Sequence, residues 1–70
     1  MRTMNKAEQS AAWDLFARVY GTVYDNKRHL IRHYRAFRRQ FFYSQLMGCW
    51  MLHQWHGMTV GIEKDGYTHT

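Results

Sequence analysis

The sequence contains no proline and only one cysteine, Cys49, among its 70 residues. Without proline, no position is barred from a helix interior. A single cysteine cannot form a disulfide within the chain, which is typical of proteins in a reducing compartment. No apolar run approaches the roughly 20 residues that a membrane-spanning helix needs, and no segment resembles a signal peptide. We therefore expect a cytoplasmic protein.

Large aliphatic side chains are also scarce, because Leu, Ile, Val and Phe together number only 13 of 70 residues. Three Trp, five Tyr and five Met supply the missing apolar volume. A chain of this length buries only about 60% of its unfolded surface, so a lone core is marginally stable. We expect one small domain over residues 1–70 that is completed by homodimerisation.

The first third of the chain has the pattern of an amphipathic helix. Asn5 is a favourable N-cap and Glu8 stands in capping-box position. Ala12, Phe16 and Val23 belong to one apolar stripe with helical spacing. This pattern predicts a helix over about residues 6–24.

The middle of the chain predicts a second, longer helix, over about residues 26–56, which either Asp25 or Asn26 caps and Gly57 ends. The following segment, 58–70, is rich in β-formers around a turn at Asp65–Gly66 and predicts a short β-hairpin or an extended tail. The predicted fold class is therefore all-α, an antiparallel two-helix hairpin with a short C-terminal extension.

Positive charge is concentrated in the second predicted helix. Residues 26–57 contain six basic and no acidic residues, whereas the rest of the chain has four basic and five acidic ones. Four of the arginines recur with helical spacing and form one exposed stripe, called here the arginine ridge: Arg28, Arg32, Arg35 and Arg39. Arginine pairs bidentately with phosphate, so the ridge, supported by Lys27 and Arg38, predicts a nucleic-acid-binding face. The function that we expect is a non-catalytic regulatory or accessory protein bound to DNA or RNA.

The second half of the same predicted helix is apolar on nearly all sides. The shorter first helix would leave part of it uncovered, and such an overhang is typical of an interface. The residues predicted to form this dimer or partner interface are Phe42, Leu46, Met47, Trp50, Met51, Leu52 and Trp55. If a different protein covers the overhang, the alternative function is an adaptor or inhibitor that binds an acidic partner protein.

The remaining chemistry is sparse. Cys49, His53 and His56 would share one helix face and are weak candidates for metal ligands, because a fourth ligand is missing. The sequence has no acid–base pair, activated nucleophile or phosphate-binding loop, so we expect neither an enzyme nor a cofactor or metal. Binding to a membrane surface is disfavoured because apolar and basic residues are segregated along the helix instead of forming two parallel faces.

Overall fold

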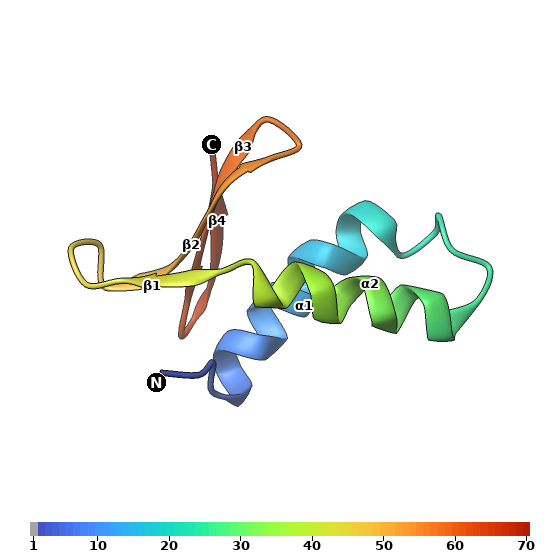
Figure 1. Cartoon of the computed structure of the whole chain (residues 1–70), viewed down its shortest axis with the longest axis horizontal. Helices are drawn as coiled ribbons and strands as arrows, with labels where there is room; N and C mark the ends of the chain where they lie inside the picture. The colour runs from blue at the N-terminus through green and yellow to red at the C-terminus, as the bar shows by residue number, and fades with distance from the viewer. Residues whose placement is uncertain (1) are drawn as a thin grey trace.

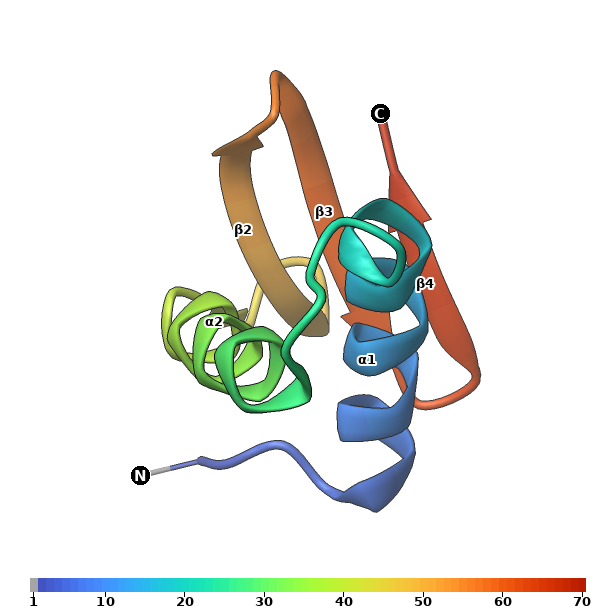
Figure 2. The same cartoon turned by 90° about the vertical axis from the view of Figure 1, so that its right-hand side faces the viewer.

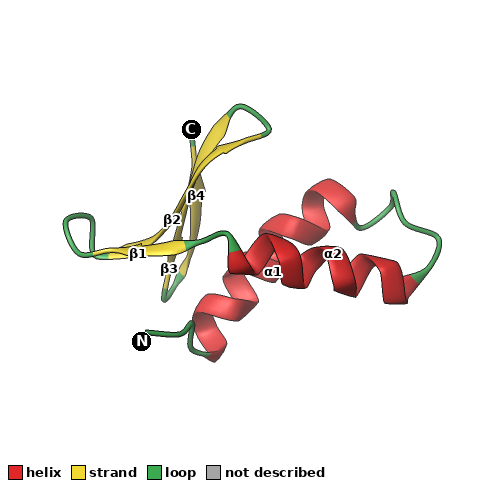
Figure 3. Cartoon of the chain, in the orientation of Figure 1, coloured by secondary structure: helices red, strands yellow, loops and turns green. Residues whose placement is uncertain are grey.

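A computed structural model describes residues 2–70. Two helices precede a four-stranded antiparallel sheet whose strands follow one another in sequence order (Figures 1 and 3). The elements are α1 (Lys6–Tyr20), α2 (Lys27–Arg39), β1 (Phe42–Ser44), β2 (Cys49–Trp55), β3 (Met58–Glu63) and β4 (Gly66–His69). Both helices lie on one side of the sheet (Figure 2). The fold is therefore α+β, and the prediction of an all-α helical hairpin is wrong.

The start of α1 matches the sequence pattern. The Asn5 side chain accepts a hydrogen bond from the Glu8 backbone N–H at 2.8 Å, and the Glu8 carboxylate accepts one from the Asn5 N–H at 2.9 Å. The helix ends at Tyr20, so the predicted limit at residue 24 is too late. Gly21 follows, and glycine is a poor helix former. Val23 is consequently 63% exposed rather than part of the buried stripe.

The second predicted helix is less than half as long as expected. α2 begins directly after its N-cap Asn26 but ends at Arg39, and residues 42–55 form β1, a turn and β2. Gly48 allows this turn, because its φ of 69° lies in the left-handed region and its N–H donates to the Ser44 carbonyl. The predicted helix over residues 26–56 is therefore wrong beyond Arg39.

The β2 strand explains why this segment looked helical. Trp50 and Leu52 face the helices and are buried, while Met51 and His53 alternate with them on the other face. Because apolar residues occupy both faces, the period of two that marks a strand is hidden. Gly57, the predicted helix stop, lies instead in the β2–β3 turn with φ of 74°.

The core lies between the helices and the inner face of the sheet. Its largest fully buried side chains are Leu15, Phe16, Phe37, Val60 and Ile62. α1 packs against β3 and β4, whereas α2 packs on α1 and projects away from the sheet (Figures 1 and 2). The segment predicted as a C-terminal tail contributes β3 and β4, which pair within the chain.

Candidate functional site

The arginine ridge lies entirely on α2. Arg28, Arg32, Arg35 and Arg39 are all exposed, and α2 is a regular helix over the whole interval between them. At about 1.5 Å per residue the ridge is roughly 17 Å long. The structure therefore brings these four predicted residues together on one solvent-facing surface.

The opposite side of α2 holds the helix in place. Leu30, Tyr34 and Phe37 are buried against α1 and the core. The Tyr34 hydroxyl donates to the Gln9 carbonyl oxygen at 3.0 Å. Because this anchored side is turned toward α1, the arginine ridge is presented outward on a fixed scaffold.

The two remaining predicted cations occupy different positions. Lys27 is exposed in the first turn of α2. Arg38 is half-buried: its Nη1 donates to Gln9 Oε1 at 3.1 Å, and its guanidinium lies 5.4 Å from the centre of the Tyr34 ring. Arg38 therefore also ties α2 to α1, in addition to contributing charge.

The positive charge at the start of α2 is electrostatically unfavourable for the helix itself. Lys27 and Arg28 stand in the first turn, which contains no acidic residue. The helix dipole places partial positive charge at this end, so each cation there lowers the stability of the helix by roughly 0.3–1 kcal/mol. Within residues 2–70, the arginine side-chain hydrogen bonds go to neutral groups, from Arg18 to the Tyr67 hydroxyl and from Arg38 to Gln9.

The positive surface continues beyond α2. Arg35, Arg38 and Arg39 line one surface hollow, and Arg38 and Arg39 share a second hollow with Arg2 of the N-terminal segment. Arg2 is held there by its guanidinium, which lies 3.9 Å from the centre of the Tyr43 ring. Sequence reasoning missed Arg2 because only the tertiary structure brings the N-terminal segment beside the end of α2.

The predicted interface residues are dispersed by the change of fold. Trp50, Leu52 and Trp55 are buried in the core, and Met51 is half-buried on the outer face of the sheet. Phe42, Leu46 and Met47 are exposed at 48, 94 and 63% of their surfaces, in β1 and the turn after it. The prediction of a helical overhang that forms a dimer or partner interface is therefore wrong. Homodimerisation itself stays a prediction.

The candidate metal ligands are also separated. Cys49 and His53 lie on β2, whereas His56 lies in the β2–β3 turn and shares a hydrogen bond with the Tyr20 hydroxyl. The helix face that would have carried all three does not exist. Within residues 2–70, no three His, Cys, Asp or Glu side chains are grouped to hold a metal ion.

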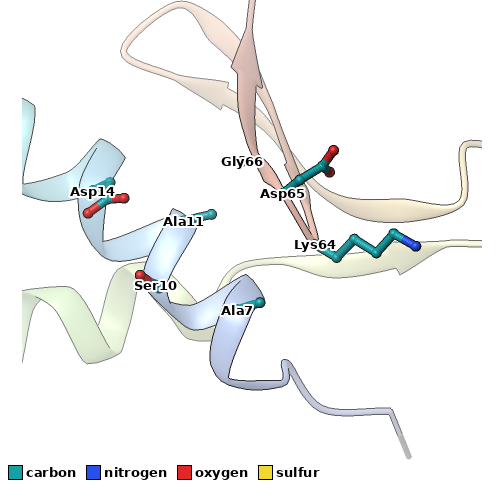
Figure 4. Close-up of a pocket in the computed structure, with 7 residues that line it drawn as sticks. All are labelled: Ala7, Ser10, Ala11, Asp14, Lys64, Asp65 and Gly66. Carbon is teal, nitrogen blue, oxygen red and sulfur yellow. The ribbon is translucent and has the colours of Figure 1, made fainter.

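Acidic residues gather between the first half of α1 and the β3–β4 turn. Figure 4 shows a hollow between α1 and the β3–β4 turn, lined by Ala7, Ser10, Ala11, Asp14, Lys64, Asp65 and Gly66. The Asp14 and Asp65 carboxylates point away from each other in this view. Glu8 and Glu63 line a neighbouring hollow together with Tyr43, the ring on which Arg2 lies, so the acidic surface adjoins the Arg2 end of the basic one.

Comparison with known proteins found no matching family model, no similar curated protein and no similar solved structure. None of the helices in residues 2–70 is long and apolar enough to cross a lipid bilayer.

Proposed function

We propose that the protein binds the phosphate backbone of nucleic acid through the arginine ridge. The observation that carries this proposal is the presentation of four exposed arginines along one side of α2, a helix that contains no carboxylate. Nucleic-acid backbones offer a row of phosphates, with one charge per ~3.4 Å along each strand, which matches a linear ridge better than a single anion does.

The anchoring of α2 supports the same proposal. A helix fixed on one side and projecting from the sheet is able to approach a groove or a backbone without a change in fold. Arg2, beside the end of the ridge, extends the surface toward additional phosphates. Backbone contacts carry no sequence information, so we expect strong salt dependence and little preference among sequences.

The experiment is a titration of the protein into labelled duplex DNA and duplex RNA, followed by fluorescence anisotropy at about 50 and 200 mM salt. If the ridge neutralises four phosphates, the log–log salt slope on B-DNA is about −4. The double variant Arg32→Gln/Arg35→Gln removes two of these contacts and is expected to flatten the slope by about 2.

The matched control is Lys6→Gln/Lys64→Gln, which removes the same charge from exposed positions outside α2. This control is expected to keep the wild-type slope. Equal losses in both double variants would mean that net charge, not the ridge, drives binding. If neither polymer binds at the lower salt concentration, the proposal fails and an acidic protein surface becomes the better explanation of the ridge.

A further inference from the structure

One surface hollow brings together arginines that lie far apart in the sequence. It lies between the N-terminal segment and the end of α2 and has a volume of about 330 Å³. Arg2, Arg38 and Arg39 are among its lining residues, and it is called here the arginine pocket. Among residues 2–70, no Asp or Glu lines it. Three cations in one concave site favour an anionic ligand.

The buried part of the lining contains an unpaired hydrogen-bond donor. Met4, Phe41 and Trp50 line the arginine pocket and are only 8, 7 and 7% exposed. Within residues 2–70, the Trp50 Nε1 is the one buried side-chain nitrogen or oxygen atom that has no hydrogen-bond partner. Buried donors are nearly always paired, so this indole N–H and the three guanidinium groups together favour a ligand that carries acceptor oxygens.

Two of the three guanidinium groups are held in place by neutral partners. The Arg2 guanidinium lies 3.9 Å from the centre of the Tyr43 ring. Arg38 Nη1 donates to Gln9 Oε1 at 3.1 Å, and Gln9 Nε2 donates in turn to the Met4 carbonyl oxygen at 2.8 Å. Gln9 thus links α2 to the N-terminal segment. Because these groups are already ordered, a ligand that binds them loses less affinity to the cost of ordering side chains.

The positive surface ends at the arginine pocket. Beyond Tyr43, the adjoining hollow is lined by the carboxylates of Glu8 and Glu63. A row of phosphates that followed the arginine ridge past Arg39 would meet these like charges next, and the repulsion would disfavour its continuation. The pocket therefore suits the last phosphate of a row better than a phosphate inside one.

We propose that the arginine pocket binds a phosphate monoester, the group that ends a 5′-phosphorylated nucleic-acid strand and that also occurs in free mononucleotides. A monoester carries about −1.5 to −2 charge at pH 7 and three strong acceptor oxygens. A phosphodiester inside a strand carries one charge, so three guanidinium groups complement the monoester better. Recognition of a strand end rests on the proposed function, whereas a free nucleotide would bind without it.

The test follows the indole N–H signals of the three tryptophans in NMR spectra of the ¹⁵N-labelled full chain. At about 0.1 M salt, adenosine 5′-monophosphate (AMP) is expected to bind saturably and to shift the Trp50 signal, which Trp50→Phe identifies. Trp13 and Trp55 lie outside the arginine pocket, so their signals are expected to move less. Adenosine lacks the phosphate and should leave all three signals unchanged at the same concentrations.

Two variants separate the arginine pocket from the ridge. Arg2→Gln removes a guanidinium that does not belong to the ridge and is expected to weaken AMP binding about 10-fold. The matched control is Arg28→Gln, which removes the same group roughly 17 Å from Arg39 along α2. This distance exceeds the Debye length of about 10 Å, so the control is expected to keep the AMP affinity to within about twofold. Both residues are exposed, so both variants are expected to fold.

The source of the phosphate is distinguished by two short single-stranded oligonucleotides of one sequence, with and without a 5′-phosphate. Recognition of a strand end predicts that the phosphate raises the affinity of the wild type about 10-fold, and that of Arg2→Gln by less. AMP binding with equal affinity for both oligonucleotides would assign the pocket to free nucleotides. AMP binding by a protein that does not bind duplex DNA or RNA would keep this site and overturn only the proposed function.

Three results would overturn the site itself. The first is that AMP shifts no indole signal, or shifts those of Trp13 or Trp55 but not that of Trp50. The second is that adenosine shifts the Trp50 signal as strongly as AMP does, since the phosphate would then contribute nothing. The third is that Arg2→Gln and Arg28→Gln weaken AMP binding equally, because net charge would then explain the binding.

Discussion

The ring of Phe37 in α2 packs against the indole of Trp55 in β2, with ring centroids 4.8 Å apart. Phe37 is 1% exposed, and its ring also contacts those of Phe16 and Phe41. α2 otherwise packs mainly on α1 and projects beyond the sheet. The position of the arginine ridge relative to the sheet therefore depends strongly on this aromatic contact.

Shortening Phe37 is expected to destabilise the whole domain. A 70-residue protein has a free energy of unfolding of roughly 4–10 kcal/mol. Phe37→Ala is expected to lower it by about 3–5 kcal/mol, which would leave much of the protein unfolded. Phe37→Leu is the measurable change and is expected to cost about 1–2 kcal/mol in urea denaturation. The exposed Ile31, changed to Ala, is the control and should stay within about 0.5 kcal/mol of wild type.

The helix caps contribute independently of the core. Asn26 accepts a hydrogen bond from the Arg28 N–H at 2.8 Å, and Asn5 forms a capping box with Glu8. Asn26→Ala and Asn5→Ala are each expected to lower the free energy of unfolding by about 1 kcal/mol. Ser10→Ala, at an exposed position within α1, should leave the unfolding midpoint within error; a comparable loss there would contradict a specific capping effect.

One residue near the end of β2 is held in a strained backbone conformation. Gln54 has φ of 60°, beside the register shift between Leu52 and Trp55. A residue with a Cβ pays about 1 kcal/mol for this region, and glycine does not. Gln54→Gly is therefore expected to raise the free energy of unfolding by up to about 1 kcal/mol.

The control for this substitution is Gln40→Gly. Gln40 has φ of −77°, which any residue adopts readily, so glycine there should be neutral or destabilising. Equal effects of the two glycine substitutions on urea denaturation would show that Gln54 is not strained in solution.

The Cys49 thiol predicts a dependence of stability on alkaline pH. Burial, and then the charge of Glu63, raise the pKa of this thiol above its ordinary value of 9.0. The folded protein thus binds the thiol proton more tightly than the unfolded chain does. The resulting stabilisation of the folded state is complete below pH 9 and is lost as the pH rises through the raised pKa of the thiol.

The effect of the thiol is isolated by the difference in unfolding free energy between wild type and Cys49→Ala, measured from about pH 7 to about pH 10.5, because groups other than Cys49 contribute equally to both proteins. The difference should shrink in favour of the variant above pH 9. A difference that stays constant over the whole range would show that the thiol has the same pKa in both states.

Local signals in the sequence predicted part of this fold. The Asn5–Glu8 box predicted the start of α1, and the arginine spacing predicted the ridge, because each depends on residues within a few positions. The start of α2 was predicted to within one residue, with Asp25 and Asn26 as alternative caps, and the structure selects Asn26. The end of α2 had no such marker. Arg38 and Arg39 are favourable in a last helical turn, but neither proline nor glycine follows until Gly48.

The sheet could not be predicted without knowledge of the tertiary packing. Residues 42–55 contain aromatic and apolar residues on both faces, and only packing distinguishes the buried Trp50 from its neighbour Met51. The same limit applied to the residues predicted as weak candidate metal ligands. A helical reading grouped Cys49 with His53 and His56, whereas the strand places Met51 between the first two and directs His56 to Tyr20.

The alternation in β2 restricts how this segment tolerates change during evolution. Its odd-numbered positions from Cys49 to His53 carry the sulfur and imidazole side chains, while Trp50 and Leu52 fill the core. A point substitution affects one face only. The insertion or deletion of a single residue would exchange the two faces and place tryptophan in solvent and the side chains of the outer face in the core. Descendants of this chain should therefore vary in the length of the turns around β2 but not in the length of β2 itself.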